Sequence, residues 1–128
     1  MLTRELEETL SQAVDEAVNY RHEYVTLEHL LYALLDNRAA RNVLISCGAK
    51  VEEIGKQLKE YFANVLEKVP IGAQLMPELT STFQSTIQHA ILQAESSGQK
   101  TVDGGAILSS IYHAEQSYAV YLLLQQDI

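Results

Sequence analysis

The sequence repeats itself at an offset of 77 residues, and this repeat limits the possible fold more than any other feature. Apolar positions of the first copy meet apolar positions of the second without a gap, beginning with Leu6 opposite Phe83. The same register aligns two residues suited to capping a helix N-terminus, Thr26 and Asp103. A repeat of this kind is typical of architectures built from copies of one supersecondary unit. We therefore predict a duplication in which each copy covers the apolar face that the other cannot bury alone.

Apolar residues recur at steps of three and four, which is the spacing of an amphipathic helix. The first copy shows this spacing in three runs, over residues 6–17, 27–35 and 51–65. No segment shows the sustained alternation that indicates a half-buried strand. Gly48 and Gly98 suit helix C-termini, because glycine readily adopts the left-handed backbone conformation found there. The sequence predicts an all-α fold, a duplicated helical repeat arranged as a pseudo-twofold bundle of about seven helices.

The length of 128 residues suits one domain, because compact domains usually have about 100 to 150 residues. Both prolines, Pro70 and Pro77, fall in one stretch, which indicates a linker between the copies. At the offset of 77, Ile128 stands opposite Val51, where the last helical run of the first copy begins. We therefore expect the chain to be a piece of a longer protein. The predicted division of the single domain 1–128 is repeat one at 1–66, a linker at 67–79 and repeat two at 80–128.

The charge balance bears on the partners. The chain carries 17 acidic and 9 basic side chains, a formal net charge of -8. Nucleic acid and anionic membranes are poor partners for such a chain, because phosphate binding needs clustered lysine and arginine. The amino terminus is acidic and lacks the features of a signal peptide, and the longest apolar stretch, Ala119 to Leu124, is far below the roughly 20 residues that span a bilayer. We expect a cytoplasmic protein.

Catalytic motifs are not evident in the sequence. Gly104-Gly105 has no following lysine, so it does not make a phosphate-binding loop, and the single Cys47 is expected to be a small buried side chain. His22, Glu23, Glu28 and His29 form a cluster, but Thr26 stands where a zinc protease motif would need its second histidine. We therefore expect no catalytic, cofactor or metal residue in this chain. A metal-dependent enzyme or sensor built on that cluster, and a stand-alone helical scaffold, remain as alternatives.

Tyrosines fall into two groups. Tyr112 and Tyr121 replace leucines of the first copy and are expected in the core or at its edge. Tyr24 and Tyr32 lie near Glu23, where an aromatic side chain can anchor a protein partner.

The run from Arg21 to Leu35, RHEYVTLEHLLYALL, resembles the repeat signature of the N-terminal domain of Clp-type AAA+ unfoldases. The segments Leu2–Leu10, Ser96–Gly98 and Tyr118–Leu123 are similar to the ClpA type of that domain, and the resemblance covers essentially the whole chain. It implies a domain that docks adaptors and substrates for a hexameric, ATP-dependent unfoldase. That unfoldase feeds the ClpP protease. The resemblance also implies the adaptor ClpS as a partner, and ATP with magnesium in AAA+ modules downstream, not in this domain.

The resemblance implies a docking site formed by Glu23, Glu28 and Thr80, while a basic residue of the same contact falls on Ser85, which is a departure. Glu28 is expected at the second position of the helix opened by Thr26, where the helix dipole stabilises a carboxylate by up to about 1 kcal/mol. Glu23 precedes that helix, so the two carboxylates are expected to share one exposed patch. From the residues alone, the favoured interpretation is that Glu28 only starts a helix and that Glu23 is only a solvated loop residue.

ClpC-type domains repeat the glutamate of this signature in both halves, where the pair helps to form phosphoarginine pockets. The position that matches Glu28 in the second copy is Gly105, so two equivalent pockets are not expected. The alternative is a ClpC- or ClpB-like domain that contacts unfolded or other adaptor-delivered substrates directly.

Overall fold

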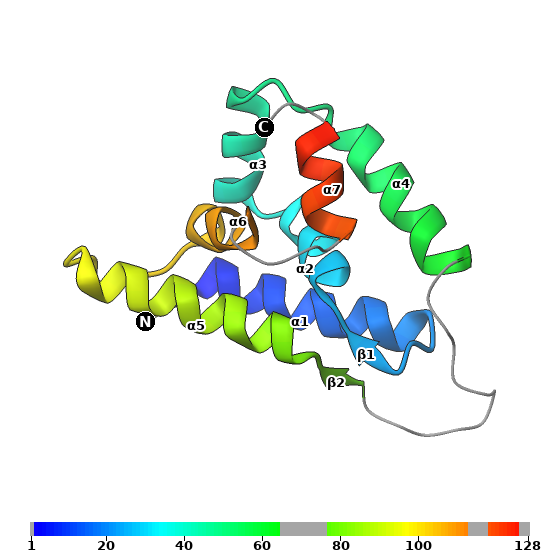
Figure 1. Ribbon diagram of the computed structural model, residues 1–128, viewed down its shortest axis with the longest axis horizontal. Coiled ribbons are helices and arrows are strands. Elements are labelled where there is room, and N and C mark those ends of the chain that lie inside the picture. The colour runs from blue at the N-terminus through cyan, green and yellow to red at the C-terminus, as the bar shows by residue number, and fades with distance from the viewer. Residues whose placement is uncertain (1, 65–76, 113–117, 126–128) are drawn as a thin grey trace.

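The computed structural model describes residues 2–64, 77–112 and 118–125. These residues form seven helices and two short strands (Figure 1). In chain order they are α1 Arg4–Asn19, β1 Tyr24–Val25, α2 Leu27–Leu34, α3 Arg38–Ser46, α4 Val51–Asn64, β2 Glu78–Leu79, α5 Ser81–Ser96, α6 Gly104–Tyr112 and α7 Tyr118–Gln125. The all-α prediction is confirmed. The predicted linker 67–79 lies mostly outside the described residues, and its last two residues form β2.

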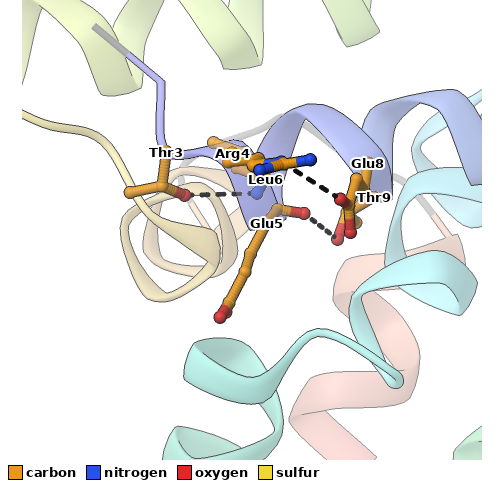
Figure 2. A network of polar contacts seen from close by, with 6 residues as sticks. All are labelled: Thr3, Arg4, Glu5, Leu6, Glu8 and Thr9. Atoms are coloured by element: carbon orange, nitrogen blue, oxygen red, sulfur yellow. Dashed lines mark hydrogen bonds and ion pairs between the residues drawn. The ribbon is translucent and has the colours of Figure 1, made fainter.

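At the start of α1, two threonine hydroxyls form hydrogen bonds with the backbone (Figure 2). Thr3 Oγ1 accepts a hydrogen bond from the Leu6 amide at 3.2 Å, and Thr9 Oγ1 donates to the Glu5 carbonyl at 2.9 Å. Such an N-cap satisfies one of the amides that a helix start leaves without an intrahelical partner. The exposed pair Arg4–Glu8, at 3.8 Å, adds little because solvent screens it.

Helix α5 repeats, at the offset of 77, the two threonine hydrogen bonds at the start of α1. Thr80 Oγ1 accepts from the Phe83 amide at 3.1 Å, and Thr86 Oγ1 donates to the Thr82 carbonyl at 2.8 Å. Because threonine occupies equivalent positions in both copies, the same hydrogen bonds form at both helix starts. This equivalence confirms the duplication at the level of single hydrogen bonds.

The two long helices also end alike. Arg21 has φ 59° and Gly98, at the equivalent position, has φ 73°. The following amides, of His22 and Gln99, bond back to the carbonyls five residues earlier at 2.9 and 2.8 Å. Both ends are therefore Schellman caps, as is the end of α3 at Gly48, with φ 84°. The predicted C-terminal roles of Gly48 and Gly98 are confirmed.

Two parallel backbone pairings tie the repeats together and were not predicted. β1 pairs with β2, with Val25 opposite Leu79 (Figure 1), and Leu2 forms an isolated parallel bridge with Val102. At the offset of 77, Leu2 corresponds to Leu79 and Val25 to Val102, so the two pairings are copies of each other. Each repeat thus pairs its strand with the segment that opens the other repeat, which is the contact expected of a pseudo-twofold arrangement.

The core lies between the repeats, with α2 in its middle (Figure 1). Helix α2 contacts α1, α4, α6 and α7, and every residue of α2 is buried except Tyr32. Helix α6 supplies the matching side chains Ile107, Leu108 and Ile111, all at most 2% exposed. Cys47 is exposed, not buried as expected, because it follows the last turn of α3. Within the described part of the chain, no helix has the length and apolar character needed to cross a membrane.

Candidate docking site

The β1–β2 pairing brings Glu23 and Thr80 to one place on the surface. The Glu23 carbonyl accepts from the Glu78 amide at 3.1 Å, and the Thr80 amide donates to the Val25 carbonyl at 3.2 Å. Two of the three predicted site residues, one from each repeat, therefore flank the same short ladder. We call the segments 23–25 and 78–80 the docking ladder.

The side chains of the docking ladder combine negative charge with apolar surface. Glu23 and Glu78 are exposed, and Tyr24 and Leu79 are 46% and 40% exposed. An exposed tyrosine beside acidic groups is the kind of surface that anchors a protein partner, since aromatic side chains supply much of the energy of interfaces. Tyr32 lies apart from this surface, half-buried against Phe62 at a ring distance of 5.6 Å.

Thr80 belongs to the docking ladder and also stabilises the start of α5. Its hydroxyl caps α5, and its side chain is half-buried. Ser85, where the resemblance would place a basic residue, is exposed on the next turn of α5. The position is thus accessible to a partner but carries no positive charge.

The prediction that Glu28 shares an exposed patch with Glu23 is wrong. Glu28 is only 6% exposed, and its Oε2 accepts a hydrogen bond from the Ala119 amide at 3.0 Å. Ala119 is the second residue of α7, so the carboxylate sits at the N-termini of both its own helix and α7. Two helix N-termini favour a negative charge here, which explains how a buried carboxylate is tolerated.

The environment of Glu28 shifts its titration. Burial raises the pKa of Glu28 above its ordinary value, while the hydrogen bonds from Ala119 and Thr26 oppose that rise. Burial also raises the pKa of Tyr61, and the charge of Glu28 adds to this effect. Glu28 therefore joins α2 to α7 beneath an aromatic group.

That aromatic group is a stack of three tyrosines from α4 and α7, which the sequence did not reveal. Tyr61 and Tyr118 stack with centroids 4.4 Å apart at 11°, and Tyr118 stacks on Tyr121 at 5.8 Å. Tyr121, expected in the core or at its edge, is 53% exposed, because α7 turns that side of its first turns outward. The side chain of Tyr112 lies outside the described residues. The spacing of Tyr118 and Tyr121 on one helix face was the available signal, but their partner on α4 depends on the fold.

His22 and His29 form a buried hydrogen-bonded chain. The His22 Nε2–H donates to the Phe62 carbonyl at 3.0 Å, so its Nδ1 accepts from His29 Nε2–H at 2.8 Å. His29 Nδ1 then accepts from the Thr26 amide at 2.9 Å. This arrangement requires the neutral form of His29. Burial, followed by electrostatic repulsion from His22 when that ring carries a proton, lowers the pKa of His29 to about 3.

This chain of bonds bears on the metal alternative. All four ring nitrogens of His22 and His29 take part in hydrogen bonds, so zinc could bind only by breaking them. Glu23 points to the surface and Glu28 to α7, so the four residues do not converge on one point. Among the described residues, no three histidine, cysteine or acidic side chains form a group suited to a metal ion.

Comparison with known protein families shows which family the chain belongs to. The Clp repeat (R) N-terminal domain family matches residues 1–126. The chain belongs to this family. A ClpA homolog protein from Fuscovulum blasticum is 35% identical to it, over 94% of this chain and 16% of that protein. The chain therefore spans about a sixth of the length of this relative.

Solved structures agree with the fold. The N-domain of ClpV from Vibrio cholerae matches with a TM-score of 0.77 and 23% identity, over 98% of this chain and 76% of that one. The Hsp104 N-terminal domain from Candida albicans matches with a TM-score of 0.82 and 9% identity, over 99% and 82%. A complex of a ClpV N-domain with a VipB peptide matches with a TM-score of 0.73 and 25% identity, over 98% and 78%.

Proposed function

We propose that this domain docks adaptors and substrates for a ClpA-type ATP-dependent unfoldase that feeds the ClpP protease, and that a ClpS-type adaptor binds at the docking ladder. The observation that carries the proposal is the exposed, acidic and aromatic surface formed where Glu23 and Thr80 meet across the two repeats. The identity to a ClpA homolog and the peptide complex of a related N-domain support it. Hexamer assembly, ATP and magnesium binding and delivery to ClpP would then belong to other modules of a cytoplasmic protein.

Glu28 has a different part in this proposal from Glu23. Its carboxylate is engaged by the Ala119 amide, so it acts by holding α7 against α2. Glu23, which is exposed, contacts the adaptor directly. Thr80 combines both roles, since it caps α5 and borders Glu78 and Leu79.

The test measures adaptor affinity by fluorescence anisotropy with a labelled ClpS-type protein. We expect Glu23→Gln to weaken binding at least about tenfold, because truncating a charged contact at an interface costs about 2 kcal/mol or more. Thr80→Asn keeps a side-chain acceptor for the α5 cap but changes the surface, and is also expected to weaken binding. Glu28→Gln keeps an oxygen for the Ala119 amide and should bind nearly as well as the parent chain.

Glu53→Gln is the matched control, because Glu53 is exposed on α4 away from the ladder. It should leave the affinity unchanged. Parent affinity in both Glu23→Gln and Thr80→Asn would remove the ladder from the docking site. A tenfold loss with Glu28→Gln in a stably folded variant would instead show that the adaptor reads its charge.

The ClpC- or ClpB-like alternative has support of its own. Tyr121 and Leu124 on α7 are 53% and 59% exposed, and exposed apolar side chains can hold unfolded segments. Binding of a chemically unfolded model protein that is lost in Tyr121→Ser and kept in Glu23→Gln would favour direct substrate contact over adaptor docking.

A further inference from the structure

A cavity of about 380 Å³ opens where the end of α2 meets α3 and α4, and no residue of the docking ladder lines it. Its floor is apolar, formed by the buried side chains of Leu35 and Val51 and by half-buried Tyr32. This size falls in the range of sites that hold small ligands, roughly 300 to 1,000 Å³. We call this cavity the α4 pocket.

The rim of the α4 pocket has a small excess of basic over acidic side chains in an otherwise acidic chain. Three of the nine basic side chains line it, Arg41, Lys56 and Lys59, together with the acidic Asp36 and Glu52. Lys59 also lies near Glu16, since its charge lowers the pKa of that carboxyl against the larger effect of burial. Lys56 is exposed on α4 one turn before Lys59. The pocket therefore offers ammonium groups beside an apolar floor.

Arg41 is held in place by the protein itself. Its Nη1 donates to the Leu35 carbonyl at 3.1 Å, and its Nη2 lies 3.6 Å from Glu52 Oε1. The part-buried hydrogen bond to the Leu35 carbonyl orients the guanidinium before it meets an anion, while the pair with Glu52 is exposed and adds little. The Arg41 side chain therefore lines one side of the α4 pocket in a fixed orientation.

Gly55 keeps the pocket open at a cost to the helix that carries it. It lies in the middle of α4, where glycine is about 1 kcal/mol less favourable than alanine. Packing does not demand it, because a Cβ at this position would approach only Leu35 Cδ1, at 3.4 Å, an ordinary contact. The backbone there is regular helix, so no positive φ requires glycine either. What a larger side chain would remove is the space above the apolar floor.

We propose that the α4 pocket binds the carboxyl-terminal end of a polypeptide whose last side chain is apolar. The last residue of a polypeptide carries a carboxylate and a side chain on the same Cα. Its carboxylate can therefore contact the cations of the rim while its apolar side chain contacts the floor. Asp36 and Glu52 make multiply charged anions poor ligands, which selects a single carboxylate over a phosphate group. The site shares no residue with the docking ladder, so it stands or fails independently of adaptor binding.

The experiment titrates the isotope-labelled 128-residue chain with the peptide Gly-Ser-Gly-Ala-Leu and follows backbone amide signals by NMR. The same peptide with a carboxyl-terminal amide is the matched probe. The free acid should shift signals of residues 51–59 and 32–36, with an affinity at least about tenfold higher than that of the amide, because a charged hydrogen bond is lost in the amide. Inorganic phosphate at equal concentration should not compete.

Three variants locate the site. Lys56→Gln should weaken the free acid several-fold and leave the amide unchanged, while Gly55→Leu should abolish binding of both by filling the pocket. Lys100→Gln, outside the pocket, is the control and should bind as the parent does. Equal affinity for acid and amide, parent binding by both Gly55→Leu and Lys56→Gln, or shifts confined to the docking ladder would each overturn the proposal.

Discussion

At the scale of the residue, two buried titratable groups behave differently because their partners differ. Glu28 meets helix N-termini, which favour its charged form, while His29 lies between His22 and the Thr26 amide, where burial disfavours a proton. A proton on His29 Nδ1 would face the Thr26 N–H, a donor against a donor. The neutral form of His29 is therefore part of the folded structure, and acidification works against it.

His29 makes stability depend on pH in a defined window. The unfolded imidazole binds a proton near 6.5, whereas the folded one stays neutral down to about 3. The unfolded state thus holds more protons in this window, so stability is complete above 6.5 and falls by at most about 1.4 kcal/mol per pH unit below it. Burial raises the pKa of Glu28, which opposes this loss just above 4.5. Urea unfolding at a series of pH values measures the slope.

His29→Gln is the matched variant for that slope. Glutamine at this position forms a capping box with Thr26, so the bond from the Thr26 amide is kept while the titrating group is removed. The variant should lose clearly less stability than the parent between pH 6.5 and 4.5. Identical slopes in the two proteins would show that His29 does not titrate as the structure indicates.

At the scale of the element, equivalent helix ends show what one residue contributes. The caps that follow α1 and α5 have the same hydrogen bonds, but one places Arg21 and the other Gly98 in the left-handed conformation. A residue with a Cβ pays about 1 kcal/mol or more for that conformation, and glycine does not. The first repeat is therefore less well capped than the second at the corner that leads into β1.

Arg21→Gly should stabilise the domain by roughly 0.5 to 1 kcal/mol, the left-handed strain relieved less the extra entropy of glycine in the unfolded chain. Gly98→Ala should destabilise it by about 1 kcal/mol for the converse reason. Chemical denaturation of both variants beside the parent checks the pair. Effects of the same sign would contradict the equivalence of the two caps.

At the scale of the whole molecule, the repeats form one cooperative unit. The parallel pairings exchange segments between the copies, and α2 and α6 meet in a shared core. Leu31 and Leu108 are equivalent at the offset of 77 and are 0% and 2% exposed. Neither repeat can bury its apolar face without the other, so the family fold needs both.

Leu31→Ala and Leu108→Ala should therefore have similar effects, each about 2 to 5 kcal/mol, although they lie in different repeats. In both variants, helix content from circular dichroism and tyrosine fluorescence should report one coincident unfolding transition. Separate transitions, with only the mutated repeat melting early, would show that the copies fold independently.

Much of the helical structure was readable from local chemistry. The apolar periodicity of residues 6–17 and the left-handed turns at Gly48 and Gly98 depend on neighbours within a few positions, and both appear in the structure. The register of the repeat was readable because the same spacing recurs 77 residues later. The two parallel pairings were not readable, because two-residue strands are too short to show alternation. The candidate site was predicted only in part. Glu23 was expected at the surface and is exposed there, whereas Glu28 was expected beside it and is buried.

The sequence by itself determined the class, the duplication and the family, because each is written in spacing along the chain. Only the tertiary structure decided which groups meet. It buried Glu28 against the Ala119 amide, joined Glu23 to Thr80 across the ladder and opened the α4 pocket beside Gly55. The physical reason is that burial and pairing depend on residues far apart in the chain. The apolar periodicity of a helix shows which face is buried. It does not show which distant group packs against a polar residue at the end of that helix, such as Glu28.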